Sequence, residues 1–402
     1  MKKFITYNQS MEILDSLCIS SLSTQKLYVA DSLGRILAED IIALENSPAF
    51  TTSGMDGYAI KHDDLKLGKL KITGKNPAGS IVKSSVTNGT AIKTFTGSLM
   101  PQGSDTLIPI EYVTVQDGYI LINDKVPEGF AVRSIGENYK QNELLIAKGT
   151  LIDFAHIGVM ASLNKVQVEV YLKPTISIAS TGSEILDVGE VQINDAQIRS
   201  SNHLTLEAIA KKNGAEVFQM GVVKDDRKSI TNLLQQALLK SDIIVTTGGV
   251  SVGDYDYVKD IIKDELQCEV LFQGVLIKPG QHILFAKKGN KFIVGLPGFA
   301  YSSSVTFILY ILPLLFKLKG SKESLNIVDA IIDEPFIKKG NKTNFTACNI
   351  QFKETHYHID FKGKKEGTSA ILTNMLGDTA LLIQDQNSED LKKGDRVKVI
   401  LL

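Results

Sequence analysis

A regular alternation of short β-rich runs and helical segments constrains the fold of this chain more than any other feature. After Pro174, the run TISIAST ends in a glycine turn, and Gly214 stops the helical segment that follows it. The same alternation continues to residue 319. Helices are expected at 199–213, 225–240, 255–266 and from Ala300 onward. Such alternation favours a parallel sheet with helices on both faces, so we expect an α/β domain over residues 173–319.

Two other regions have a β-rich sequence pattern without this alternation. From Asn46 to about Arg133, glycines recur between short runs such as TLIPIEYVTV and GYILI, a spacing typical of a compact β-rich region with tight turns. After Gly320 the chain is β-rich again, and polar turns separate its runs. Helical spacing also occurs at 8–18 and 153–163. A chain of 402 residues is too long for one ordinary core, so several domains are expected.

Charge and hydropathy limit the kinds of partner that this chain is expected to bind. The formal net charge is −1 and the pI is about 6.6, so the chain has no general basic field for DNA or an anionic membrane, and neither partner is expected. The three cysteines are far apart and indicate neither a disulfide framework nor a zinc site. The apolar run Tyr301–Leu318 is interrupted by Pro313 and Lys317, which favours a buried amphipathic helix over a membrane span. We expect a cytoplasmic protein.

Three glycine-rich turns fall where an open parallel sheet collects its ligands, beyond the carboxyl ends of strands. They are STGSE (180–184), TTGGVSVGDYD (246–256) and GLPG (295–298). Gly248 and Gly249 would let backbone N–H groups approach a phosphate. Asp254 and Asp256 follow, and carboxylates beside a phosphate imply a hard cation such as Mg²⁺. The alternative is an ordinary strand-end turn whose aspartates cap the next helix.

Other polar segments leave two interpretations open. Ser302 and Ser303 stand where a helix start would favour an anion, but helix capping explains the same hydroxyls. Lys278 precedes a Pro-Gly turn and would supply a point charge to an anion, or would simply lie on the surface. Asp56 lies in a dense polar turn, where an Asx turn is the alternative. The lysine clusters at 338–342 and 362–365 are expected to be solvated turns.

Taken together and in order, these segments resemble the molybdopterin molybdenumtransferase family, which includes the gephyrin E domain and its bacterial counterparts. The matching segments are SGMDGYAI (53–60), TGSLMPQGSDTLIPIE (96–111), RSIGEN (133–138), STGSE (180–184), SN (201–202), TTGGVSVGDYDYVK (246–259), KPG (278–280), GLPG (295–298) and EGTSAILTNM (366–375). One such segment is a weak signal, whereas nine in register are specific.

The resemblance implies an α/β multidomain fold. Its expected parts are an elongated N-terminal dimerisation domain (1–45 and 136–172), an inserted β-rich domain (46–135), the α/β molybdopterin-binding domain (173–319) and a C-terminal β-barrel (320–402). It also implies a homodimer whose active site lies between subunits. The implied reaction inserts molybdate into adenylylated molybdopterin and releases AMP with Mg²⁺. The molybdopterin adenylyltransferase and acceptor molybdoenzymes are the implied protein partners.

The resemblance also assigns residues by position. The polar residues at the reaction centre would be Asp56, Thr96, Glu184, Asp226 and Asp256. The magnesium ligands would be Glu184, Asp254 and Asp256. The substrate contacts would be Thr181, Gly182, Ser201, Asn202, Thr247, Gly248, Gly249, Ser251, Gly253, Asp254, Lys278, Pro297, Gly298, Ser302 and Ser369.

The oxyanion segments depart from the family pattern. Where the family has K-P-G-K-P, Gln281 and His282 follow Lys278-Pro279-Gly280, and Phe299 follows GLPG. Residues 340–347 contain no arginine. Each charge-assisted hydrogen bond contributes about 1.5–3 kcal/mol, so these changes predict weaker molybdate binding. The alternative function is therefore a molybdopterin-binding or scaffold paralogue. A dinucleotide-dependent oxidoreductase is disfavoured because the first strand is not followed by G-x-G-x-x-G.

Overall fold

The computed structural model describes residues 4–81, 83–249, 257–365 and 369–402. The chain forms two compact units. The larger unit comprises residues 1–38, 149–153 and 167–402, and the smaller unit comprises 39–148 and 154–166. The finer division into four domains remains a prediction.

A six-stranded sheet with the order β7-β4-β6-β5-β9-β8 forms the smaller unit's core. Its strands are β4 (Gly57–Ile60), β5 (Lys69–Asn76), β6 (Thr90–Thr94), β7 (Thr106–Pro109), β8 (Val113–Gln116) and β9 (Tyr119–Ile122). The same unit also contains β2 (Ile41–Ile42), β3 (Thr52–Ser53), β10 (Val132–Arg133), β11 (Leu144–Ile146), α2 (Phe154–Ser162) and the 3-10 turns η2 (His62–Leu67) and η3 (Ile110–Tyr112). This unit is β-rich, as its glycine spacing predicts.

The larger unit is organised around a central sheet with the order β16-β13-β17-β21-β20-β18. Its strands are β13 (Thr175–Thr181), β16 (Glu216–Val223), β17 (Ile243–Thr247), β18 (Glu269–Gln273), β20 (Leu284–Lys288) and β21 (Lys291–Leu296). β13 pairs in parallel with β16 and β17, and β17 pairs in parallel with β21. The four strand ends at Thr181, Val223, Thr247 and Leu296 therefore share one side of the sheet, the carboxyl edge.

The expected all-parallel sheet is wrong at one strand. β20 runs antiparallel to both β21 and β18. The reason is local: only Gly289 and Asn290 separate β20 from β21, and so short a connection can join only antiparallel strands. Gly289 has φ +59°, the left-handed backbone that such a hairpin turn requires.

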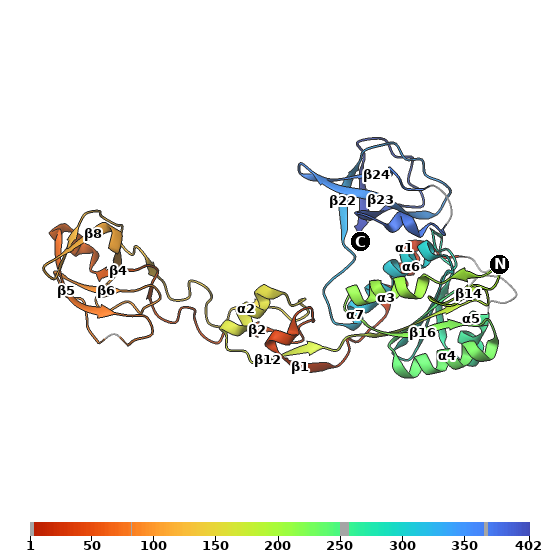
Figure 1. The fold of residues 1–402 in the computed structure, drawn as a ribbon, viewed down its shortest axis with the longest axis horizontal. Helices are drawn as coiled ribbons and strands as arrows, with labels where there is room; N and C mark the ends of the chain where they lie inside the picture. The colour runs from red at the N-terminus through yellow and green to blue at the C-terminus, as the bar shows by residue number, and fades with distance from the viewer. Residues whose placement is uncertain (1–3, 82, 250–256, 366–368) are drawn as a thin grey trace. The chain divides into compact units, whose positions relative to one another are not determined.

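Helices cover both faces of the central sheet (Figure 1). One face packs against α1 (Tyr7–Ser16), α3 (Asn202–Lys212), α6 (Ala300–Thr306), the π turn η5 (Phe307–Ile311) and α7 (Leu312–Leu318). The other face packs against α4 (Arg227–Lys240), α5 (Tyr257–Asp260) and the π turn η4 (Ile261–Glu265). Alternate residues of β17 divide between the faces, since Val245 joins the first core and Ile244 the second. The two-sided covering is confirmed.

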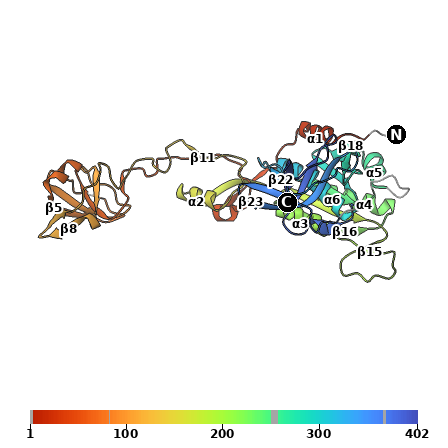
Figure 2. The same cartoon turned by 90° about the horizontal axis from the view of Figure 1, so that it is seen from above.

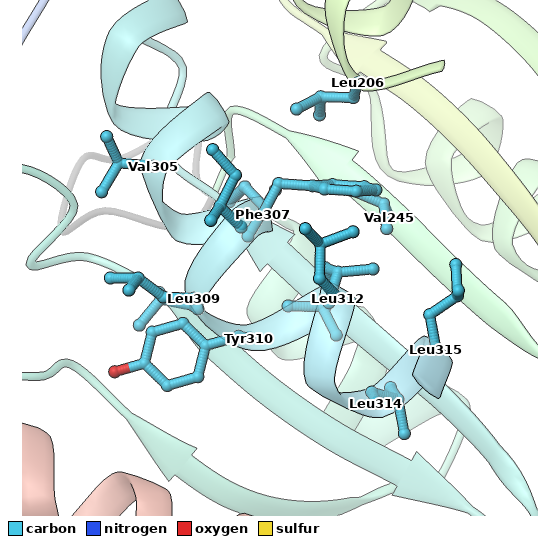
Figure 3. Packing of buried hydrophobic residues seen from close by; sticks show 14 of the residues in the cluster. Leu206, Val245, Val305, Phe307, Leu309, Tyr310, Leu312, Leu314 and Leu315 are labelled. Carbon is cyan, nitrogen blue, oxygen red and sulfur yellow. The ribbon is translucent and has the colours of Figure 1, made fainter. Parts of the chain in front are cut away.

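The continuous helix Ala300–Leu318 is the one helix in the described ranges that is long and apolar enough to cross a membrane. Its most apolar window is 89% buried, with Leu309 and Tyr310 fully covered (Figure 3). Pro313 lies inside this continuous helix, directly after the π turn η5 and Leu312, so the irregular turn stands where the proline removes a backbone N–H. The expectation of an amphipathic helix is wrong, because α1 and the C-terminal strands cover the side that the sheet leaves open.

A closed five-stranded barrel follows the helix, confirming the expected C-terminal barrel. Its ring has the order β23-β24-β22-β26-β25, and pairing of β23 with β25 closes it. The strands are β22 (Ile327–Ile332), β23 (Thr343–Lys353), β24 (His356–Asp360), β25 (Thr379–Gln384) and β26 (Arg396–Leu401), with the 3-10 turn η6 (Leu372–Met375). β19 (Ile277–Lys278) leaves the α/β region and pairs with β23.

Five smaller elements complete the larger unit. β1 (Thr24–Tyr28), the 3-10 turn η1 (Val29–Ser32) and β12 (Gln167–Tyr171) form a ribbon, in which β1 and β12 pair antiparallel. β14 (Ile185–Leu186) and β15 (Ile198–Arg199) pair in parallel. The connection between β14 and β15 extends away from the sheet (Figure 2).

Candidate functional site

The three glycine turns predicted from the sequence meet at the carboxyl edge. The Gly248 amide donates to the Leu296 carbonyl (3.0 Å), and the Gly182 amide donates to the Val223 carbonyl (3.2 Å). A Cβ atom at Gly298 would lie 3.8 Å from the Gly248 Cα. Residues far apart in the sequence thus surround one short stretch of backbone.

Glycine is required at the centre of this stretch. Gly248 has φ +95°, and a Cβ there would lie 2.7 Å from the Thr181 carbonyl oxygen. Gly249 has φ +66°, and a Cβ there would lie 2.6 Å from Val258 Cγ2. Both positions combine a left-handed backbone with close packing, so no other residue fits without displacing its neighbours. The turn therefore presents its backbone at the carboxyl edge.

Hydroxyl and amide side chains link the ends of these segments. Thr247 Oγ1 and Ser180 Oγ are 3.0 Å apart in the buried interior, and Thr181 Oγ1 donates weakly to the Thr247 carbonyl (3.5 Å). Asn202, the first residue of α3, donates from Nδ2 to the Gly298 carbonyl (2.6 Å). The predicted contacts Thr181, Thr247, Asn202 and Gly298 therefore belong to one cluster. Ser201 and Pro297 adjoin it in the chain.

Two predicted carboxylates lie near this edge. The exposed Glu184 folds back toward Gly182, where an added Cβ would lie 3.0 Å from both carboxylate oxygens. Asp226 caps α4 by accepting from the Ser229 amide (2.9 Å). Hydrogen bonding from the Ser229 side chain, and secondarily from its amide, holds the pKa of the Asp226 carboxyl below its ordinary value.

The remaining predicted residues of the second turn, Ser251, Gly253, Asp254 and Asp256, lie outside the described residues. Within the described ranges, no group of three or more His, Cys, Asp or Glu side chains is arranged to hold a metal ion. Glu184 places an exposed carboxylate, the type of ligand that a hard cation takes, beside the glycine turn.

Asp56 and Thr96 meet in the smaller unit. Asp56 Oδ1 accepts from the Thr96 amide (2.8 Å) and from its hydroxyl (2.7 Å). The backbone hydrogen bond from Thr96 is the main cause that lowers the pKa of the Asp56 carboxyl. The predicted pair is thus a preformed contact with an ionised, exposed carboxylate.

The predicted oxyanion residues lie where the barrel joins the α/β region. Lys278 is exposed at the end of β19, in register with Asn344 of β23. The Ser302 amide donates to the Ser369 carbonyl (3.2 Å). Helix capping by Ser302 or Ser303 is wrong, because the helix begins at Ala300 after Phe299, which makes no side-chain cap. The serines fall inside the first turn, where the Ser303 hydroxyl donates to the Ala300 carbonyl (3.0 Å).

The expectation that the C-terminal lysine clusters are solvated is wrong for Lys338, whose Nζ donates to the Gln386 carbonyl, and for Lys342 and Lys364. Lys342 Nζ donates to Gln281 Oε1, at the position where the family pattern has its second lysine. Lys364 Nζ donates to the Asn374 carbonyl (2.8 Å), and its burial lowers the pKa of its ammonium. The barrel folds these side chains inward, which turn composition alone does not indicate.

Comparisons with known proteins agree with this geometry. The family described as "MoeA N-terminal region (domain I and II)" matches residues 5–164, and the one described as "Probable molybdopterin binding domain" matches residues 177–317. A molybdopterin molybdenumtransferase of Staphylococcus aureus is 32% identical over 390 residues, covering 95% of this chain and 92% of that protein. The chain belongs to the molybdopterin molybdenumtransferase family.

Other relatives support the same assignment. The Haemophilus influenzae molybdopterin molybdenumtransferase is 33% identical over 302 residues, covering 75% of this chain and 74% of that protein. The crystal structure of a molybdopterin biosynthesis moeA protein from Pyrococcus horikoshii covers 100% of both chains, with a TM-score of 0.83 and 27% identity. The chain is thus an enzyme of molybdenum cofactor biosynthesis, and the family implies molybdopterin and molybdate as its substrates.

Sequence reasoning missed several polar residues at the molybdenumtransferase barrel. Asn344 Oδ1 and both side-chain polar atoms of Gln384 are buried with no hydrogen-bond partner among the described residues. Asn344 and Gln384 face each other across β23 and β25, and Asn344 pairs with Lys278. Strand pairing brings these two residues to Lys278 from distant parts of the sequence, so no local sequence motif predicts them.

Proposed function

We propose that this enzyme inserts molybdate into the dithiolene of adenylylated molybdopterin, with Mg²⁺-dependent release of AMP. The observation that carries the proposal is the meeting of the three glycine turns around Gly248, packed against Thr181. The Gly248 amide is already used by the Leu296 carbonyl, so the Gly249 amide, which a Cβ would crowd, is the N–H group of this turn suited to a phosphate of a nucleotide-linked pterin. Thr181, Thr247 and Asn202 would position the same ligand.

Carboxylates would supply the rest of the hydrolytic site. Mg²⁺ would be held by Glu184 with Asp254 and Asp256, and would neutralise charge on the phosphates. Water would hydrolyse the phosphoric anhydride to AMP and the pterin phosphate, which releases two protons. These two protons and the two protons of the dithiol would leave with two molybdate oxygens as two water molecules when the two sulfurs bind molybdenum. Asp226 would contribute a further carboxylate, and Asp56 and Thr96 of the smaller unit are proposed as reaction residues by their position in the family pattern alone. We also propose a cytoplasmic homodimer that receives its substrate from the adenylyltransferase and delivers the cofactor to acceptor molybdoenzymes.

The molybdate oxyanion would bind at Lys278, with Ser302 and Ser369 as neighbours. The contact of Lys342 with Gln281 favours a second cation at this site, supplied by the barrel in place of the family's lysine. Lys342→Met should therefore weaken molybdate binding, whereas Lys365→Met, at an exposed position in the same barrel, should not.

The decisive assay mixes the purified chain with adenylylated molybdopterin, molybdate and Mg²⁺. AMP release that rises with molybdate supports the transferase. Release that is absent or independent of molybdate contradicts it.

The second candidate is a molybdopterin-binding or scaffold paralogue, favoured by Gln281, His282 and the 59% exposed Phe299. Calorimetry separates the two functions. Tight molybdopterin binding with no molybdate binding in either the wild type or Gln281→Lys favours the paralogue. Tight molybdate binding by the unmodified chain contradicts it.

A further inference from the structure

A chain of hydrogen-bonded side chains runs through the larger unit to the glycine turn. His203 Nδ1 and Ser200 Oγ are 2.9 Å apart, Ser200 Oγ and Ser180 Oγ are 3.1 Å apart, and Ser180 Oγ and Thr247 Oγ1 are 3.0 Å apart. All four residues are buried, with exposed fractions between 2% for Thr247 and 7% for Ser200. At the outer end, His203 Nε2 lies 3.1 Å from Oδ1 of Asp187, whose side chain is 41% exposed. The chain thus connects a solvent-accessible carboxylate to the residue before Gly248.

The direction of these hydrogen bonds follows from the protonation of His203. The Asp187 carboxylate only accepts, so a neutral ring carries its hydrogen on Nε2 and accepts at Nδ1. Ser200 must then donate to His203, Ser180 must donate to Ser200, and Thr247 must donate to Ser180. Each hydroxyl has a single hydrogen, so no other fully bonded arrangement exists.

Protonation of the ring reverses the chain. The imidazolium donates from Nδ1 to Ser200, which donates to Ser180, which donates to Thr247. The hydrogen of the Thr247 hydroxyl is then released. Among the described residues Ser180 is the only hydrogen-bond partner of that hydroxyl, so the released hydrogen is available to an acceptor at the turn.

We infer that His203 is a positioning residue whose protonation turns the Thr247 hydroxyl into a hydrogen-bond donor for a phosphate at the Gly248–Gly249 turn. The inference rests on the proposed function, since it takes this turn as the phosphate site. Binding of the anion and protonation of His203 favour each other, because each stabilises the same hydrogen-bond direction. Histidine is the side chain suited to this role, since it ordinarily changes charge between about pH 5 and 8.

The surroundings of His203 contain charges of both signs. Besides Asp187, the charged groups near it on neighbouring elements and on its own helix are Glu190, Arg199, Glu207 and Lys211. β16 contributes the Gln219 amide, which donates to the His203 carbonyl (3.0 Å). Of these groups, only Asp187 contacts the ring directly.

Calorimetry tests the inference with the full chain and metal-free molybdopterin. Titrations between pH 6 and 8, in two buffers of different ionisation enthalpy, give the affinity and the number of protons taken up. The wild type should lose up to tenfold in affinity per pH unit through His203, since one proton is linked. Thr247→Val keeps the side-chain volume and removes the hydroxyl. It should weaken binding at pH 6 on the order of tenfold or more and should take up less than the wild-type quantity of protons.

Matched variants separate this role from a structural one. His203→Asn should show the same reduced proton uptake as Thr247→Val, while His356→Asn, an exposed histidine of the barrel, should keep the wild-type pH slope. The titration of the ligand's own phosphate is common to all variants and cancels in the differences. Thermal unfolding identifies the variants that are folded at the assay temperature, and Thr247→Val decides the test if His203→Asn is not.

Three outcomes overturn the inference. If molybdopterin binds and both variants keep the wild-type pH slope, the relay is wrong and the proposed function stands. If the wild type binds no molybdopterin at any pH, the proposed function fails and the inference fails with it. Nitrogen NMR of the ligand-free chain is independent of any ligand. It should find the hydrogen of neutral His203 on Nε2, and a hydrogen on Nδ1 overturns the inference.

Discussion

Replacing Gly248 by alanine perturbs the carboxyl edge at its tightest point. Alanine in the left-handed region costs about 1–2 kcal/mol. The added Cβ would also lie 2.7 Å from the Thr181 carbonyl oxygen and 3.0 Å from Thr181 Oγ1, well inside van der Waals contact. Forcing an extra carbon into a packed site costs about 1–3 kcal/mol more. The free energy of unfolding of the larger unit should therefore fall by roughly 2–5 kcal/mol.

Gly289→Ala is the matched control. Gly289 belongs to the same sheet and also has positive φ (+59°), but a Cβ there would meet nothing within 4 Å. In Gly289→Ala the free energy of unfolding should fall only by the cost of an alanine in the left-handed region, about 1–2 kcal/mol. The difference between the two variants then measures the contact with Thr181.

Circular dichroism during urea unfolding is the suitable assay, because the chain contains no tryptophan. Molybdopterin binding is measured in parallel, and Gly289→Ala should bind as the wild type does. If Gly248→Ala unfolds at the same urea concentration as Gly289→Ala and binds the pterin equally well, the close packing of the turn on Thr181 has no energetic role and our reasoning about the site is refuted.

Two further predictions concern the barrel and the thiols. The hydrogen bond from His358 lowers the pKa of the Asp333 carboxyl, so the stabilisation it gives is present above the ordinary carboxyl pKa and is lost as the pH falls through the lowered value. Asp333→Asn should therefore lower the melting temperature at pH 7 but not at pH 2, and an equal loss at both would contradict this. Burial raises the pKa of Cys348 to about 12 and also raises that of Cys268. Iodoacetamide at pH 8 should thus label only the exposed Cys18 in the native chain, as mass spectrometry can check.

Local patterns predicted most of the central sheet. The strand–helix alternation after Pro174 is a short-range signal, and the structure confirms both the elements and the covering of both faces. The reversed strand β20 also had a local signal, since Gly289-Asn290 between two apolar runs is typical of a hairpin. No local signal in the sequence predicted that the helix Ala300–Leu318 is buried on all sides. Its open side is covered by Leu14 of α1 and by Phe345 of the barrel, which are distant in the sequence.

The same division applies to the candidate site. Gly248 was predictable because a glycine pair at a strand end is a local signal for a turn with positive φ, which the structure has, whether the turn binds a phosphate or only ends the strand. His203 was not, because its role depends on Ser200, Ser180 and Thr247 converging from separate elements. A single histidine in a helical segment carries no sign of such a chain.

The proposed oxyanion site illustrates why a missing motif residue does not by itself predict a lost activity. Gln281 replaces a lysine of the family pattern, and from the sequence that change removes one charge from the oxyanion site. In the fold, Lys342 reaches Gln281 from a segment 61 residues further along the chain. A charge near an anion acts through its position and not through its place in the sequence, so at the proposed oxyanion site a lysine supplied by the barrel would have the same electrostatic effect. Gln281→Lys should accordingly add little affinity for molybdate while Lys342 is present, and should restore affinity in Lys342→Met. A large gain in the wild-type background would show that Lys342 does not replace the missing charge.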